Sequence, residues 1–212
     1  KEYGQSPRTV RALSNVSMTI GQGEFVAITG PSGCGKTTLL SILGAMSSPT
    51  EGRVEINGVD LYQLSSDKLA DFRSQNIGFV FQQLHLIPYL TAIENVMLPL
   101  TIIRSSSKRE MAQKALEAMG LANKESRLPG ELSGGEQARV CIARALVREA
   151  PLILADEPTG NLDSRTGEGV IQLLHSVNER GHTIVMVTHS SQAAREANRI
   201  VSMVDGQVVS PV

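Results

Sequence analysis

Short apolar runs alternate with longer stretches of helical spacing along most of this chain. Runs of strand length lie at 24–29, 77–81, 151–155 and 183–188, and the first is followed by a helical pattern over 36–46. Apolar residues at consecutive positions indicate strands that are buried on both faces. Buried strands that alternate with helices are typical of a parallel sheet covered by helices, so the pattern predicts an α/β fold.

A weaker alternation of apolar and polar residues predicts antiparallel strands near both ends of the chain. The segment 10–20 alternates before a glycine-rich turn, so we expect a strand there. Two further patterns surround Asn57-Gly58 and Asp205-Gly206, and dipeptides of this kind favour tight hairpin turns. The segments concerned are 53–57 for the first turn, and 200–204 with 208–209 for the second.

The stretch from 82 to 130 differs from the rest because it contains many helix formers and little strand pattern. Between Lys108 and Met119, apolar residues recur at helical spacing. We therefore predict a helical lobe inserted into an α/β core. In this interpretation residues 1–212 form one domain, whose core comprises about 1–82 and 150–212 and whose helical subdomain comprises about 83–149.

Composition and charge narrow the classes of protein to which the chain can belong. Of its 212 residues, 41% are apolar and 19% are charged, which is typical of a soluble globular protein. A formal net charge of −1 argues against a nucleic-acid partner. Two cysteines, Cys34 and Cys141, cannot build the disulfide framework of a small secreted protein, so we expect a reducing compartment.

The apolar runs are too short for a membrane-spanning helix. The longest apolar stretch, from Leu84 to Ile103, is interrupted by polar residues and prolines, and no run reaches about 18 residues. No signal-peptide pattern opens the sequence. Because the chain starts at Lys1 without a methionine, we expect its natural beginning to lie upstream.

A glycine-rich segment between the first buried strand and its helix matches the phosphate-loop pattern G-x-x-x-x-G-K-[ST]. Glycines allow backbone N–H groups to approach phosphate oxygens closely, and the helix N-terminus favours negative charge. Lys36 would contact the β- and γ-phosphates, and Thr37 would ligate Mg²⁺. The alternative is a simple glycine-rich turn, and we interpret Cys34 as a small filler residue. The expected binding residues are Gly30, Pro31, Ser32, Gly33, Cys34, Gly35, Lys36, Thr37 and Thr38.

Two carboxylates follow the apolar strand at 152–155. Adjacent residues on a strand point in opposite directions, so Asp156 and Glu157 can have different tasks. We expect Asp156 to hold Mg²⁺ through water and Glu157 to orient or deprotonate an attacking water. A solvated turn is the alternative, but it is a poor fit directly after buried apolar residues.

The segment Leu132-Ser133-Gly134-Gly135-Glu136 precedes a strongly helical run. Ser133 is a good N-cap, and Glu136 three residues later completes a capping box. The segment could therefore be only the start of a helix. Two consecutive glycines are poor helix formers, however, and they fit a site where a backbone or a phosphate approaches closely.

These motifs together resemble the ATP-binding-cassette (ABC) transporter ATPases. The resemblance covers essentially the whole chain, and it adds Gln82 after a strand, Asp163 in an Asn-Leu-Asp loop and His189 after the next strand. It implies a P-loop NTPase core with a mainly parallel sheet, an N-terminal antiparallel β subdomain and an inserted α-helical subdomain. The stretches 77–82, 94–99 and 156–163 resemble the subfamily that serves macrolide export and lipoprotein release.

The family resemblance also implies ATP and Mg²⁺ as cofactors and a homodimer that closes on ATP. Ser133, Gly134 and Gly135, with Glu136 beside them, would contact the γ-phosphate of an ATP held by the partner chain, and Asp163 would reach across the dimer. Gln82 would sense Mg²⁺ and the attacking water, and His189 would contact the γ-phosphate. Tyr3 would stack on adenine, although a surface tyrosine is the alternative.

The resemblance further implies an integral membrane permease as partner and a place on the cytoplasmic face of the inner membrane. The apolar residues around 84–98 would either complete the core or line a groove for that partner. We expect an ATPase that powers an export or extraction complex. The main alternative is a mechanotransmission ATPase that regulates a membrane-bound sensor or cell-wall hydrolase. A soluble ABC ATPase acting on DNA or ribosomes and a P-loop kinase or GTPase fit the motifs less well.

Overall fold

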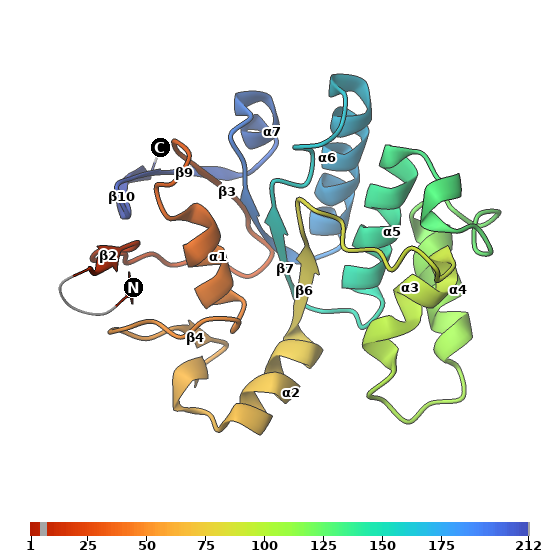
Figure 1. The fold of residues 1–212 in the computed structure, drawn as a ribbon, viewed down its shortest axis with the longest axis horizontal. Coiled ribbons are helices and arrows are strands. Elements are labelled where there is room, and N and C mark those ends of the chain that lie inside the picture. The colour runs from red at the N-terminus through yellow and green to blue at the C-terminus, as the bar shows by residue number, and fades with distance from the viewer. Residues whose placement is uncertain (5–7, 212) are drawn as a thin grey trace.

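The computed structural model, which describes residues 1–4 and 8–211, contains a six-stranded sheet that runs through its centre (Figure 1). Only the strand at one edge is antiparallel to its neighbour, and all other pairs are parallel. The α/β fold predicted from the apolar runs is therefore confirmed. In spatial order the strands are β10 (Gln207–Pro211), β9 (Arg199–Val204), β3 (Phe25–Thr29), β8 (Thr183–Val187), β7 (Leu152–Asp156) and β6 (Ile77–Val80).

The two faces of this sheet pack against different sets of elements. Along β3, Phe25 and Ala27 join one core cluster, whereas Val26 and Ile28 join the other, as the alternation of side chains along a strand requires. The first cluster contains residues of α5 (Gly134–Leu146), α6 (Ser164–Glu179) and α7 (Ser191–Arg195). The second contains residues of α1 (Lys36–Leu43) and α2 (Ser66–Asn76). Both faces of the sheet are therefore covered by helices.

Helix α1 is shorter than the helical pattern over 36–46 predicts. It ends at Leu43, and Gly44 lies so close to β6 that a Cβ atom there would be 2.3 Å from the Phe79 ring. The chain then turns through Ala45, whose φ is 55°. Close packing against the sheet thus ends the helix before its sequence pattern ends.

Two small antiparallel sheets accompany the central one. Strands β1 (Glu2–Tyr3) and β2 (Val10–Arg11) form the first, and β4 (Glu55–Ile56) and β5 (Val59–Asp60) form the second, followed by the 3-10 helix η1 (Leu61–Gln63). The predicted strand over 10–20 is wrong beyond Arg11. Its alternation is real, because Val16, Met18 and Ile20 pack against the core, but Asn15 has a φ of 52° and no partner strand pairs with residues 12–20.

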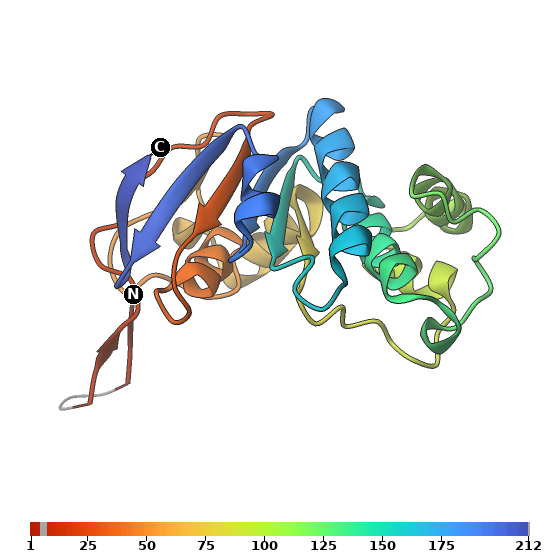
Figure 2. The same ribbon diagram turned by 90° about the horizontal axis from the view of Figure 1, so that it is seen from above.

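The segment predicted to be a helical lobe contains helices and 3-10 turns. Figures 1 and 2 both show its helices at the β6 end of the sheet, far from β10. Helices α3, α4 and α5 contact one another, and α5 also packs against β6. No helix among the described residues is long and apolar enough to cross a bilayer. The elements before α5 are α3 (Ala92–Met97), η2 (Leu98–Leu100), α4 (Lys108–Ala118) and η3 (Pro129–Glu131).

Candidate nucleotide-binding site

The phosphate loop connects the carboxyl end of β3 to the first residue of α1. Its shape depends on Gly30 and Gly35, whose φ angles are 152° and 101°. A Cβ atom at Gly30 would lie 2.2 Å from the Met203 carbonyl oxygen, and one at Gly35 would lie 2.4 Å from the Ala12 carbonyl oxygen. No larger residue fits at either position, so the glycine spacing read from the sequence has a steric cause.

Lys36 is the first residue of α1, and its side chain is bound inside the loop. It is only 7% exposed, and its ammonium group donates hydrogen bonds to the carbonyl oxygens of Gly30 at 2.8 Å and Pro31 at 2.9 Å. The N-terminus of α1 has no side-chain cap. Its first N–H groups and the lysine therefore form a compact cationic end of the kind that binds phosphate. In the same loop Pro31, Ser32 and Gly33 are exposed, Thr38 is half-buried and Cys34 is buried.

The acidic strand end lies beside this loop. Thr37 donates a hydrogen bond of 3.3 Å to Asp156 Oδ1, which joins the start of α1 to the end of β7. Burial raises the pKa of Asp156, and the negative charge of Glu157 also raises it, while the Thr37 hydrogen bond acts in the opposite direction. A hydroxyl and a carboxylate thus meet where the phosphates of a nucleotide in the loop would end.

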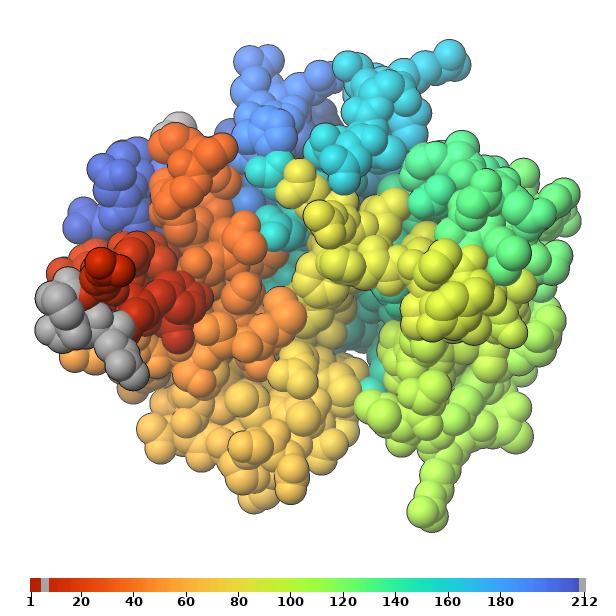
Figure 3. All heavy atoms as spheres, in the orientation of Figure 1, coloured from red at the N-terminus to blue at the C-terminus, as the bar shows by residue number. Residues whose placement is uncertain are grey.

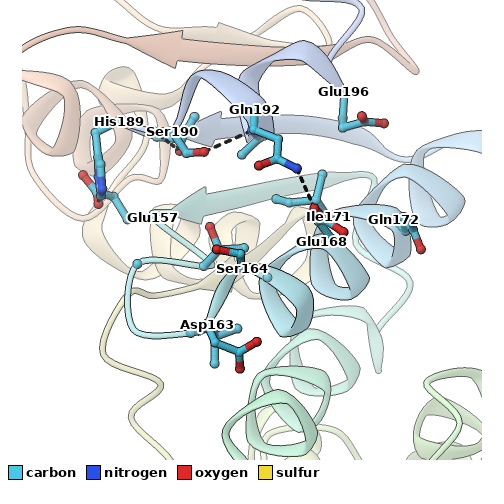
Figure 4. A pocket seen from close by; sticks show the side chains of 16 residues that line it. Glu157, Asp163, Ser164, Glu168, Ile171, Gln172, His189, Ser190, Gln192 and Glu196 are labelled. Carbon is cyan, nitrogen blue, oxygen red and sulfur yellow. Dashed lines mark hydrogen bonds and ion pairs between the residues drawn. The ribbon is translucent and has the colours of Figure 1, made fainter.

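Glu157 has a different hydrogen-bond partner from that of Asp156. Its Oε2 atom is hydrogen-bonded to His189 Nδ1 (Figure 4). The backbone at Glu157 has a φ of 45°, and its N–H donates to the Val187 carbonyl oxygen at 2.9 Å. The side chain of Glu157 is 19% exposed, whereas that of His189 is 65% exposed. The histidine therefore fixes the carboxylate and also faces outward.

Gln82 comes close to the same carboxylate through Gly160. A Cβ atom at Gly160 would lie 3.0 Å from Gln82 Nε2 and 3.4 Å from Glu157 Oε2. The side-chain amide of Asn161 donates to the Gln82 carbonyl oxygen at 3.1 Å. The sequence reading did not single out Gly160 or the Asn161 contact. Their position in the sequence, between the acidic pair and Asp163, could have drawn attention to these two residues. Only the fold shows what they contact.

A pocket of about 320 Å³ opens next to Glu157 and His189. It lies between the start of α6 and helix α7, and Figure 4 shows Asp163, Glu168 and Gln192 around it. Asp163 caps α6: it accepts hydrogen bonds from the Thr166 N–H at 3.0 Å and from the Thr166 hydroxyl at 2.6 Å. The hydroxyl contact is the main reason that the pKa of Asp163 is lowered.

The glycine pair at 134–135 lies apart from the phosphate loop of the same chain. Figures 1 and 2 both show α1 and the start of α5 on different sides of the strands β7 and β8. The predicted capping box is present, because Ser133 Oγ accepts from the Glu136 N–H at 3.3 Å and the Ser133 N–H donates to Glu136 Oε2 at 2.8 Å. That backbone hydrogen bond is the main cause of the lowered pKa of Glu136.

Tyr3 lies on β1, at the edge of the molecule. It is 44% exposed, and the Lys1 ammonium group sits 4.9 Å from the centre of its ring. Among the described residues the tyrosine has no hydrogen-bonded link to the phosphate loop. Its predicted stacking on adenine stays a prediction.

A glycine-rich loop after a buried parallel strand, with an acidic strand end bonded to its threonine, defines a P-loop nucleotide-binding protein. A family model described as ABC transporter matches residues 13–160. The chain belongs to this family, and it is an ATP-hydrolysing cassette of the family. The resemblance inferred from the motifs is thereby confirmed.

The chain is similar in sequence to relatives of two different lengths. The chain is 46% identical over 209 residues to the macrolide export ATP-binding/permease protein MacB of Mannheimia succiniciproducens, covering 98% of this chain and 32% of that protein. It thus spans about a third of the length of such relatives. It is 49% identical to an uncharacterized ABC transporter ATP-binding protein of Methanocaldococcus jannaschii, MJ0796, and covers 92% of it.

Solved structures of MJ0796 have the same fold. A dimeric structure of its post-hydrolysis state bound to ADP and Pi superposes with a TM-score of 0.90 at 46% identity, covering 100% of this chain and 94% of that one. The predicted architecture, with a mainly parallel sheet, helices and N-terminal antiparallel strands, agrees with that cassette structure.

Proposed function

We propose that this chain hydrolyses ATP between two copies of itself and thereby powers a membrane export or extraction complex of the macrolide-efflux or lipoprotein-release type. The observation that carries the proposal is the convergence of Lys36, Asp156, Glu157 and His189 at one end of the sheet, with a second glycine-rich helix start elsewhere on the surface. Relatives with macrolide export in their names support the subtype.

The phosphate loop binds the triphosphate of ATP. Backbone N–H groups of residues 32–38, which include the α1 N-terminus, supply donors, and the Lys36 ammonium group exchanges its contacts with loop carbonyls for contacts with phosphate oxygens. Tyr3 stacks on the adenine ring, a contact that contributes on the order of 1 kcal/mol.

The oxygen donors beside the loop fit Mg²⁺. The Thr37 hydroxyl and the Asp156 carboxylate already contact each other, and Mg²⁺ in nucleotide sites is held by one or two protein carboxylates together with water and phosphate oxygens. No group of three or more His, Cys, Asp or Glu residues suited to a metal occurs among the described residues, which agrees with such a shared site. Thr37, Asp156 and Gln82 would hold the ion, which when bound neutralises charge on the β- and γ-phosphates.

Glu157 positions the attacking water and accepts its proton. The hydrogen bond with His189 Nδ1 holds the carboxylate in one orientation and leaves the other ring nitrogen of His189 free to contact the γ-phosphate. Water attacks the γ-phosphorus in line with the bond to the β-phosphate oxygen, so the products are ADP and inorganic phosphate. Gln82, near Gly160 and Glu157, links this chemistry to the segment that leads to α3.

The second half of each ATP site comes from a partner copy. Ser133, Gly134 and Gly135 are surface residues at the exposed start of α5, where a helix N-terminus can accept the γ-phosphate of an ATP bound to the other chain. Asp163 lies at the start of α6, beside the same surface. The dimeric cassette structures of MJ0796 support this arrangement.

A groove next to Gln82 is the proposed contact with a membrane permease. This pocket, of about 510 Å³, is lined by Leu84, Leu86 and Pro88 on one side and by Pro129 and Gln137 on the other. In Figure 3 the segment between β6 and α3, in yellow, lies at the surface of this face. Such a contact would place the chain at the cytoplasmic face of the inner membrane, with residues 83–149 as the subdomain that transmits ATP-driven closure.

The proposed function is tested by reconstituting the chain with a candidate permease, encoded either in the same polypeptide or by a separate gene. We expect the permease to stimulate ATP hydrolysis and ATP to drive export or extraction. Tyr89→Ala should keep basal hydrolysis but lose the stimulation, because Tyr89 is 78% exposed and follows the groove residue Pro88. Ile102→Ala, at a residue 64% exposed, is the matched control and should keep both.

Two results would contradict parts of this proposal. Hydrolysis that no permease stimulates would overturn the role in a membrane complex. Stimulated hydrolysis without movement of any substrate would favour the mechanotransmission alternative over export.

A further inference from the structure

The turn between β9 and β10 contacts the phosphate loop directly. The Gly206 N–H donates a hydrogen bond of 3.0 Å to the Cys34 carbonyl oxygen, which belongs to the loop. The Gly206 carbonyl oxygen accepts a hydrogen bond of 2.8 Å from the Ser14 N–H. One residue near the end of the described chain is therefore bonded to the loop and to a segment near its beginning.

That segment, residues 12–14, is here called the strap, and it fills the space between the turn and the loop. A Cβ atom at Gly206 would lie 2.8 Å from the Ala12 carbonyl oxygen, and one at Gly35 would lie 2.4 Å from the same oxygen. The strap is thus held between two glycines, of which one precedes Lys36 and caps α1. Neither side has room for a methyl group.

The other end of the loop rests on β9 in the same way. A Cβ atom at Gly30 would lie 2.2 Å from the Met203 carbonyl oxygen. Both ends of the loop therefore lie against main-chain atoms of β9, its turn or the strap. Main-chain contacts of this kind do not relax by a change of side-chain rotamer, so a shift of the turn or the strap must shift the loop.

We propose that Gly206 is a positioning residue for ATP: through the strap and Cys34, it fixes the curvature of the phosphate loop and so sets the affinity for the triphosphate. This inference rests on the proposed binding of ATP by the loop. A methyl group at position 206 pushes the Ala12 carbonyl toward Gly35 and displaces the N-terminus of α1. No hydrogen bond or ion pair among the described residues joins the turn to Glu157 or His189, which are proposed to act on the attacking water.

The chain provides a matched control in the hairpin formed by β4 and β5. Asp205 and Gly206 have φ angles of 46° and 76°, and Asn57 and Gly58, between β4 and β5, have φ angles of 51° and 79°. A Cβ atom at Gly58 would meet no atom within 4 Å. Alanine at either glycine carries the same left-handed strain, but only Gly206→Ala presses on a neighbour.

The experiment compares wild type, Gly206→Ala and Gly58→Ala. We expect Gly206→Ala to weaken Mg-ATP binding roughly tenfold by isothermal titration calorimetry, the effect of weakening one charge-assisted hydrogen bond. In steady-state hydrolysis its KM should rise by a similar factor while kcat at saturating ATP stays near wild type. Gly58→Ala should match wild type in binding. Equal binding by the two variants would overturn the inference.

A second variant covers the case in which Gly206→Ala does not fold. Leu13 is buried in the strap, and its Cδ2 atom lies 2.9 Å from the Cβ position of Gly35. Leu13→Ala loosens the strap without backbone strain, and we expect weaker Mg-ATP binding with little change in kcat. Unchanged binding by folded Leu13→Ala would contradict the inference. Failure of the wild-type chain to bind Mg-ATP would instead contradict the proposed function.

Discussion

The phosphate loop and the segment 133–136 both place glycines at the start of a helix, but the structure supports them differently. The start of α1 has no side-chain cap, and its glycines lie against backbone atoms of the strap and β9. The start of α5 is capped by Ser133, and a Cβ atom at Gly135 would meet only a side-chain methyl group, at 2.5 Å on Thr166.

This difference shows what each region can do alone. At α1 the free N–H groups and Lys36 form a phosphate site that the chain builds by itself. At α5 one N–H group is already bonded to Ser133, and the nearby ammonium group of Lys124 is paired with the Glu136 carboxylate at 3.2 Å. We propose that the second region acts on a phosphate brought by another molecule, as it would if two chains share each ATP.

The largest expected effect on hydrolysis concerns Glu157, which lies on the same side of this comparison as the phosphate loop. Glu157→Gln keeps the size of the side chain but removes the base, so turnover should fall by about 10²–10⁴-fold. Binding of Mg-ATP should change little, because the phosphate loop is untouched. Steady-state hydrolysis and calorimetry check the two parts, and a variant with wild-type turnover would remove Glu157 from its proposed role.

A change on the α5 side should separate binding from hydrolysis. Ser133→Asp preserves the N-cap, since Asp caps helices as well as Ser does, but places a negative charge where the partner's phosphate would lie. We expect Mg-ATP binding by the single chain to match wild type and hydrolysis to fall by about tenfold or more, as when one charge-assisted contact is lost. Ser133→Asn, a neutral cap, is the control and should lose much less activity.

The stability of the helical segment around α3 should depend on a buried polar side chain. Asn95 is fully buried, donates to the carbonyl oxygens of Leu90 and Thr91, and accepts from the Ile87 N–H at 2.7 Å. Asn95→Ala removes the side-chain partners of the Ile87 N–H and the Leu90 carbonyl oxygen, so it should cost about 1–3 kcal/mol of unfolding free energy. Thermal unfolding followed by circular dichroism measures the effect. The exposed Asn123→Ala is the control, and equal melting temperatures for the two variants would contradict this account.

The smallest expected effect concerns the buried carboxylate beside the loop. Because burial raises the pKa of Asp156, the folded state takes up its proton more readily than the unfolded state does, and the charged form destabilises the fold above that pKa. Asp156→Asn should raise the melting temperature at neutral pH by about 2 °C, with a smaller difference in acid, while weakening Mg²⁺ binding. A lower melting temperature at neutral pH would show that the carboxylate stabilises the fold.

The sequence predicted the parts of the fold that depend on local patterns. The buried strands at β3, β6, β7 and β8 follow from consecutive apolar residues, and the capping box at Ser133 follows from residue type and spacing. The strand over 10–20 was wrong because alternation reports which side chains are buried, not whether a backbone partner is present.

In the candidate site, too, local motifs could be predicted and contacts between distant segments could not. The phosphate loop and the acidic pair can be predicted because each is a contiguous motif. The hydrogen bond between Glu157 and His189 and the contact of Gly206 with Cys34 join residues far apart in sequence, so only the folded chain reveals them. Asn95 had no distinct signal, because Glu94 stands beside it and other polar residues interrupt the same stretch, and its four contacts required the loop before α3 to be in place.

The most direct test of a shared ATP site mixes two variants that each hydrolyse ATP poorly. Lys36→Met disables the phosphate loop, and Ser133→Asp disables the start of α5. A mixed dimer has one site in which both halves are disabled and one in which both are intact. If two chains share each ATP, the mixture at high protein concentration should hydrolyse ATP faster than the sum of the separate variants. A rate equal to that sum would show that each chain hydrolyses ATP alone.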